Sequence, residues 1–182
     1  GWSVGIIHDE LYTIYNALLE GKPPVLKPVT PFSQYVTWLN KQDKAVAKQY
    51  WREYLTDYHQ LSTLPHLVPQ TETAPKQAFT PEKVEFALSE TMTAAIQQMA
   101  STNQVTLNTF IQTIWGILLS IYNERNDVVF AATVSGRPAE IKGIESMVGL
   151  FINTIPVRIT MAPQETLPAL LQKIQRQATT GK

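Results

Sequence analysis

The chain has 182 residues, a length that suits one ordinary domain or part of a larger one. Apolar residues make up 44% of it, which supports a sizeable core and argues against disorder. The 15 basic and 15 acidic residues give a formal net charge of zero, so charge does not favour binding to nucleic acid or an anionic membrane surface. Cysteine is absent, which excludes disulfides and thiolate chemistry and fits a reducing, cytoplasmic location.

No membrane-spanning or targeting segment is expected. The longest apolar run ends far short of the roughly 20 residues that a spanning helix needs. The opening GWSVGIIHDE has no basic region before an apolar stretch, so it is not typical of a signal peptide. It also lacks a Met, and we therefore expect the chain to be an excerpt of a longer protein.

Helices are predicted for the first part of the chain. Apolar residues recur at helical spacing over residues 4–18, with Ser3 as a plausible N-cap and Gly21 as a stop. Two further helical stripes are expected, one beginning at residue 32 and running to about 39, the other over about 43–58. The proline-rich stretch over residues 61–81 is then interpreted as a linker between two structural units.

Beyond residue 81 the hydrophobic period changes. Val84, Phe86 and Leu88 alternate with their neighbours, which predicts a half-buried strand over 83–88. Ser89 is expected to cap the next helix, and Thr106 or Asn108 to open a helix that runs through residue 122.

The helix that ends near residue 122 is apolar on most faces, so we expect it to be buried on more than one side. Buried strands are predicted over 128–134 and 155–159, and a last helix over 167–174. This order of elements predicts an α/β fold in which helices pack on one or both faces of a sheet.

Few residues outside one stretch carry recognisable chemistry. No nucleophile elbow, zinc-protease motif or phosphate-binding glycine loop is present. His8 stands beside Asp9 and Glu10, and a surface position is favoured over a catalytic one. His59 and His66 flank the proline-rich stretch without metal-ligand spacing, so no metal site is predicted. Taken alone, the chain offers no convincing general base.

The stretch from 134 to 158 is the exception. Gly136 is expected at positive φ in a turn, and a strand that ends at Ser135 and Arg137 delivers them to a sheet edge, where sites are common. Asn153 lies among apolar neighbours and, if buried, needs partners such as backbone, Ser135 or Arg137. Residue chemistry alone leaves two interpretations open: a braced turn with a capping asparagine, or part of a functional site.

Four segments in order resemble the condensation domains of nonribosomal peptide synthetases. They are SGRP at 135–138, VGLFINT at 148–154 followed by Arg158, PFSQYVTWL at 31–39, and GWS at 1–3. The third resembles the family's Tyr-x-Asp-Phe-Ala-x-Trp segment, with Gln34 where aspartate is usual. The fourth is similar to the end of the family's His-His-x-x-x-Asp-Gly-Trp/Phe-Ser motif. The resemblance covers nearly the whole chain.

The resemblance implies a two-layer α/β fold similar to chloramphenicol acetyltransferase, with a mixed sheet packed by helices and two lobes in a V around a tunnel. Residues 1–75 would then be the end of the N-terminal lobe plus the linker, and 76–182 most of the C-terminal lobe. The family's catalytic histidine would precede Gly1, so no catalytic residue is expected within the chain, and the excerpt alone is expected to be inactive. The residues expected at the tunnel or its floor loop are Trp2, Ser135, Gly136, Arg137, Asn153 and Thr154.

The same resemblance implies an acyltransferase reaction used in antibiotic biosynthesis. An acyl or peptidyl donor would be joined to an aminoacyl acceptor, both carried on the 4'-phosphopantetheine arms of upstream and downstream carrier-protein domains, with no cofactor bound directly. Further expected partners are an adjacent adenylation domain and the missing part of the N-terminal lobe in cis. The alternatives are an epimerization or cyclization relative of the same superfamily, or a non-catalytic docking module.

Overall fold

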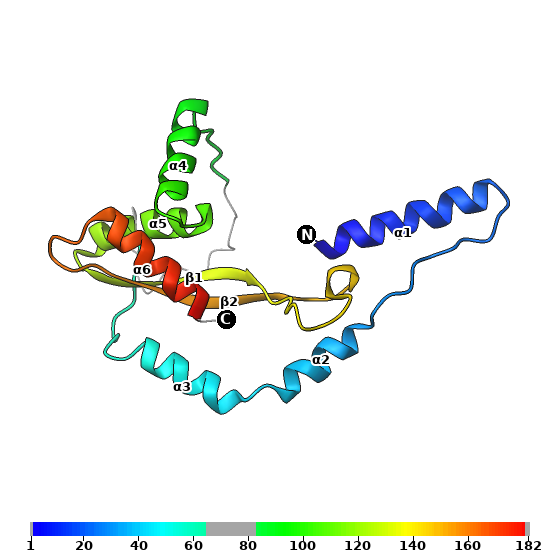
Figure 1. The fold of residues 1–182 in the computed structure, drawn as a ribbon, viewed down its shortest axis with the longest axis horizontal. Coiled ribbons are helices and arrows are strands. Elements are labelled where there is room, and N and C mark those ends of the chain that lie inside the picture. The colour runs from blue at the N-terminus through cyan, green and yellow to red at the C-terminus, as the bar shows by residue number, and fades with distance from the viewer. Residues whose placement is uncertain (1, 65–82, 181–182) are drawn as a thin grey trace, which may run out of the picture. The chain divides into compact units, whose positions relative to one another are not determined.

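The computed structural model describes residues 2–64 and 83–180 (Figure 1). His66 and most of the predicted linker lie outside these residues. The elements in chain order are α1 (Trp2–Leu19), α2 (Phe32–Lys41), α3 (Lys44–Tyr54), α4 (Glu90–Thr102), α5 (Leu107–Asn123), β1 (Asp127–Ser135), the short 3-10 helix η1 (Ile144–Ser146), β2 (Ile152–Thr160) and α6 (Leu167–Thr180).

Contacts divide the chain into two compact units. Unit 1 contains Gly1–Gln49 and Ala131–Ile155, and unit 2 contains Tyr50–Phe130 and Pro156–Lys182. The strands β1 and β2 therefore each contribute residues to both units. These units are defined by contacts within the chain, whereas the lobes expected over 1–75 and 76–182 belong to a whole domain, so the lobe assignment stays a prediction.

The end of α1 was predicted correctly, but its start was not. Gly21 has φ +67°, and the N–H groups of Gly21 and Lys22 donate to the carbonyls of Leu18 and Ala17, as in a Schellman motif. At the other end, α1 already begins at Trp2, so the prediction of Ser3 as N-cap is wrong. The Ser3 hydroxyl is instead used in a long-range contact with Gly149, which no local pattern encodes.

Local hydrogen bonds fix the starts of the later helices. Ser89 accepts from the backbone N–H of Met92 and caps α4, as predicted. Thr106 accepts from the N–H of Thr109 and caps α5, which decides between the two predicted openings in favour of Thr106. The third predicted helix ends at Tyr54, short of the predicted residue 58.

The sheet consists of β1 and β2 paired with each other. At one end Gly136 donates to the carbonyl of Phe151, and at the other Met161 donates to the carbonyl of Asn126. These two bonds show that the strands are antiparallel, and they fix one register from end to end.

The strand predicted over 83–88 is wrong for the described residues, where this segment has no regular structure. Val84 and Phe86 are 86% and 83% exposed. An alternating pattern forms a strand only where a neighbour completes the backbone ladder and a face covers the apolar side chains. The described residues supply neither to this segment.

Side chains protect the outer edges of the strand pair. In the register set by the end bonds, Val129 lies opposite Arg158, and the N–H group of each points away from the partner strand. The N–H of Arg158 donates to the Tyr54 hydroxyl at 2.7 Å, and that of Val129 donates to Ser62 at 3.0 Å. Pro156 occupies another outward position, where no ladder donor is lost. At these three positions the outer edges therefore offer no free backbone donor.

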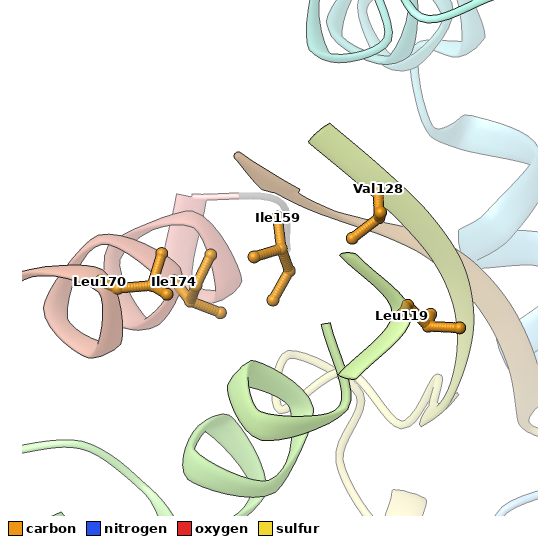
Figure 2. Close-up of a cluster of buried hydrophobic side chains, with 5 residues drawn as sticks. All are labelled: Leu119, Val128, Ile159, Leu170 and Ile174. Carbon is orange, nitrogen blue, oxygen red and sulfur yellow. The ribbon is translucent and has the colours of Figure 1, made fainter. Parts of the chain in front are cut away.

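The core of unit 2 forms where α5 and α6 meet the strands. Figure 2 shows its five buried side chains, which come from α5, β1, β2 and α6: Leu119, Val128, Ile159, Leu170 and Ile174. Gly116 on α5 brings the helix close to the sheet, because a Cβ added there would lie 2.6 Å from Ile159 Cδ1. Burial of these aliphatic side chains is the main stabilising contribution within unit 2.

Only one face of α5 is buried in the described residues, so the prediction of burial on more than one side is wrong here. The buried face carries small and polar residues such as Thr109, Thr113, Gly116 and Ser120. The opposite stripe is apolar and 38–65% exposed; it consists of Leu107, Ile111, Ile114, Trp115, Leu118, Ile121 and Tyr122. Among the described helices none alone is long and apolar enough to cross a membrane; α4 and α5 reach that limit only as a pair bent by 103°.

We predict that Gly116→Ala destabilises the protein by about 1–3 kcal/mol, because the new methyl group overlaps the β-branched side chain of Ile159. Gly5→Ala is the matched control. Gly5 lies within α1 with nothing within 4 Å of an added Cβ, and it should gain about 0.5–1 kcal/mol of stability. Urea unfolding of both variants measures the two effects. Equal midpoints for Gly116→Ala and wild type would contradict the close packing of α5 on β2.

Candidate functional site

The loop over residues 136–151, which joins β1 to β2, holds two of the six predicted site residues, Gly136 and Arg137, and is called the connecting loop. Arg137 stabilises this loop through hydrogen bonds to backbone carbonyls of the loop itself. Its guanidinium donates to the carbonyls of Ile144 and Met147, the latter at 3.0 Å, and its Cζ atom lies 3.9 Å from the centre of the Phe151 ring. Because Ile144 and Met147 are buried, their carbonyls need hydrogen-bond partners, and one arginine serves both.

Gly136 is required for close approach and not for a left-handed turn. Its N–H donates to the Phe151 carbonyl at 2.6 Å, and an added Cβ would lie 2.9 Å from that oxygen and 3.2 Å from the Tyr35 hydroxyl. Its φ is not positive, so the predicted conformation is wrong. The loop's positive φ occurs at Gly143, with φ +80°, where a Cβ would lie 2.4 Å from Thr30 Oγ1.

Aromatic side chains of α2 support the connecting loop within unit 1. The rings of Phe32 and Tyr35 meet the Phe151 ring edge-on at centroid distances of 5.2 and 4.8 Å, and Trp38 stacks on Tyr35 at 6.1 Å. With Ile141, Ile144 and Met147 they form a separate buried cluster. The sequence resemblance had marked this segment of α2, but no residue pattern indicated which loop it would contact.

Gly149 is held by both α1 and α2. The Ser3 hydroxyl donates to its carbonyl at 3.0 Å and accepts from its N–H at 3.3 Å. The Phe32 ring occupies the space that a Cβ would need, with Cδ2 only 2.1 Å from that position. The connecting loop is thus restrained just before it enters β2.

Asn153 and Thr154 lie on the exposed start of β2, and Ser135 lies on the exposed end of β1. The side-chain oxygen of Asn153 accepts from the N–H of Thr154 at 2.8 Å. Of the partners expected for Asn153, the structure therefore shows a backbone one. The expectation of a low-water setting is wrong, because Asn153 is exposed. Trp2 is the first residue of α1.

Arg158 lies in unit 2 and links β2 to β1 and to the end of α3. It makes a two-point ion pair with Asp127, with N–O distances of 2.9 and 2.6 Å, and also donates to the carbonyls of Tyr54 and Thr56. The hydrogen bonds that Arg158 donates to the Asp127 carboxylate raise the pKa of Arg158, so it stays charged. Burial raises the pKa of Tyr54, which keeps its hydroxyl neutral as it accepts from the Arg158 backbone.

The remaining polar candidates do not form a catalytic cluster. A shallow pocket of ≈ 530 Å³ in unit 2 is lined by His59 together with Asp57, Tyr58, Gln60, Arg125, Asn126, Asp127, Thr160 and Met161. His8 is exposed on α1. Across residues 2–64 and 83–180 no three His, Asp or Glu side chains are grouped so that they could hold a metal ion.

Comparison with known proteins gives the same family as the four sequence segments. The family model described as the condensation domain matches residues 1–182, the whole chain. Tyrocidine synthase 2 of Brevibacillus parabrevis is 47% identical over 176 residues, an alignment that covers 97% of this chain and 5% of the synthase. The chain therefore belongs to the condensation domain family of the nonribosomal peptide synthetases, and it spans a small part of the relative it matches.

Solved structures show the same fold at low identity. The first condensation domain of the CDA synthetase matches with a TM-score of 0.73 at 18% identity, covering 100% of this chain and 40% of that one. The X-domain in its complex with OxyB from teicoplanin biosynthesis matches with a TM-score of 0.76 at 22% identity, covering 99% and 41%. The mixed α/β arrangement is thus part of a condensation-type fold, of which the described residues contain two strands.

We predict that Arg158→Lys lowers the free energy of unfolding by about 1–3 kcal/mol although it keeps the charge, because lysine cannot reach the carboxylate at two points and two carbonyls at once. Lys22→Met is the control, since the Lys22–Glu20 pair is exposed and should change stability by less than about 1 kcal/mol. Denaturant titration distinguishes the two. A tolerated Arg158→Lys would show that the two-point geometry adds nothing beyond charge.

Proposed function

We propose that this chain is part of a condensation domain that forms a peptide bond between two carrier-bound substrates. The observation that carries the proposal is the match of the whole chain to the condensation family, joined by 47% identity to a peptide synthase. An upstream acyl or peptidyl thioester is the donor, and the amine of a downstream aminoacyl group attacks its carbonyl. Both are tethered to 4'-phosphopantetheine arms of carrier-protein domains, and no cofactor is bound directly.

The rate of such a reaction depends mostly on how the two reactants are positioned. Two tethered reactants need orientation, and the oxygen of the tetrahedral intermediate needs hydrogen-bond donors. In this proposal the catalytic histidine comes from the segment before Gly1, in the family's histidine motif, and the chain supplies positioning groups. The exposed ends of β1 and β2, with Ser135, Asn153 and Thr154, form part of the tunnel wall, and Gly136 and Arg137 form part of its floor.

Asn153 is the side chain best suited to contact substrate. Its carbonyl oxygen is occupied by the N–H of Thr154, so the side chain is oriented and its NH₂ group is the part that can donate to a substrate. A donor of this kind fits a thioester carbonyl or a pantetheine amide oxygen. Trp2, at the start of α1, is proposed to line the same tunnel next to the histidine motif.

The proposed setting is a V-shaped domain of two lobes, with 1–75 in the N-terminal lobe and the linker, and 76–182 in most of the C-terminal lobe. The partners are the upstream and downstream carrier-protein domains, an adjacent adenylation domain and the remainder of the N-terminal lobe in cis. The relative that matches is about twenty times longer than the aligned segment, since the alignment covers 5% of it. That length is consistent with a multidomain synthetase.

A docking role is the second candidate. It is favoured by the match to the X-domain, a domain of the same fold that forms a complex with OxyB. A docking module would bind its partner through the exposed ends of β1 and β2 without forming a peptide bond.

The experiment uses the intact protein that contains this chain, supplied with loaded donor and acceptor carrier proteins. Peptide formation detected by mass spectrometry supports the proposal, whereas the purified residues 1–182 alone should form no peptide. Tight carrier binding without product would favour the docking role. Inversion of the donor's α-carbon without transfer would favour an epimerization relative.

We predict that Asn153→Asp keeps stability but lowers turnover per folded molecule at least tenfold, because a carboxylate still accepts from Thr154 and donates nothing. Asn153→Ala should lose both turnover and about 1 kcal/mol of stability. Asn103→Asp, at the C-cap of α4, makes the same change of charge away from the site and should leave turnover normal. A fully active Asn153→Asp variant would mean that Asn153 only caps the backbone.

A further inference from the structure

We propose that Ser3 and Phe32 are positioning residues that lock Gly149, and through it the start of β2, against α1 and α2. This inference rests on the proposed function, because it concerns the placement of the site residues Asn153 and Thr154. It assigns a role to two side chains outside the connecting loop, one on each of two helices of unit 1.

The Ser3 contact joins the first turn of α1 to a distant loop residue. A serine hydroxyl in a first turn normally bonds to nearby backbone or points to solvent. Here it donates to the carbonyl of Gly149 and accepts from the N–H of the same residue, 146 positions away in the chain. A single hydroxyl therefore satisfies both backbone groups of one loop residue, which fixes the peptide planes on either side of it.

The Phe32 contact fixes the same residue from another direction. Three atoms of its ring would lie 2.1, 2.4 and 2.8 Å from a Cβ on Gly149, so the ring rests directly on the glycine backbone. The ring is itself held at centroid distances of 5.2 Å from Phe151 and 5.5 Å from Tyr35. Because its neighbours are packed, the ring cannot move aside without disturbing Phe151, which is only 5% exposed.

The two ends of the connecting loop meet at Phe151. Gly136 donates to its carbonyl, and the Arg137 guanidinium covers its ring. Ser3 and Phe32 fix the residue two positions earlier, and Asn153 follows two positions later. A shift of Gly149 therefore moves the exposed donors at the start of β2. In a reaction that depends on placement, a displacement of about 1 Å is enough to cost on the order of a hundredfold in rate.

A double-mutant cycle on the intact condensation-domain protein tests the Phe32 contact. Gly149→Ala should lower kcat per folded molecule at least tenfold, because the new methyl group displaces either the ring or the loop. Phe32→Ala opens that space, so the double variant should be no slower than Phe32→Ala alone. Gly116→Ala is the control: it is overpacked in unit 2 and should lower stability while kcat per folded molecule stays within twofold. Losses that multiply in the double variant would overturn the proposal.

The Ser3 contact is tested by removing and restoring its hydroxyl. Ser3→Ala should lower kcat more than it changes KM, and Ser3→Thr, which keeps the hydroxyl, should recover most of the rate. Thr13→Ala removes a hydroxyl of α1 that bonds only to the Asp9 carbonyl one turn earlier, and should have no effect on kcat. Equal rates for wild type and Ser3→Ala would contradict a positioning role for Ser3.

A measurement independent of turnover separates this proposal from the proposed function. Amide hydrogen exchange at Gly149 and Gly136 should accelerate at least tenfold in Ser3→Ala and in Phe32→Ala, and trypsin should cleave faster after Lys142. If wild type forms no peptide but these changes appear, the proposed function fails while the lock stands. If exchange and cleavage are unchanged in both variants, the lock itself is wrong.

Discussion

The antiparallel pairing of β1 and β2 is the constraint on which the rest of the structure depends. Hydrogen bonds at Gly136–Phe151 and Asn126–Met161 set one register over the whole length of both strands. That register decides which backbone groups face outward. The outward N–H groups of Val129 and Arg158 are hydrogen-bonded to side chains, and Pro156 has no N–H. The Tyr54 hydroxyl, at the end of α3, and the Ser62 hydroxyl, beyond it, accept from the outward N–H groups of Arg158 and Val129.

The same register places a buttressed end and an exposed end on one short strand. Arg158 braces the end of β2 that lies in unit 2 through Asp127, whereas Asn153 and Thr154 leave the other end exposed in unit 1. A strand that is rigid at one end and accessible at the other can present side chains to a ligand at low entropic cost. The connecting loop closes at that accessible end.

Sequence reasoning succeeded where the cause is local. The stop at Gly21 and the caps at Ser89 and Thr106 depend on bonds within a few residues. The first two were predicted, and Thr106 was one of two predicted openings. It failed where the cause is a distant partner. The strand over 83–88 needs a neighbour, Ser3 is diverted to Gly149, and the environment of Asn153 depends on the direction of a strand edge. The family was recognisable because four segments matched in order, not because any contact was foreseen.

Close packing explains the glycines at positions 136 and 149 of the connecting loop. Gly136 and Gly149 have no room for a side chain because a carbonyl, a hydroxyl and an aromatic ring already lie within contact of their backbones. At each of these glycines, a neighbouring group lies so close to the backbone that a Cβ would overlap it. For Gly136 the close neighbour is the carbonyl of Phe151, and for Gly149 it is the Phe32 ring, which itself packs on the Phe151 ring. The Phe151 side chain therefore links α2, Arg137 and the start of β2. The positions of the polar residues that follow in β2 therefore depend on the packing of an apolar side chain.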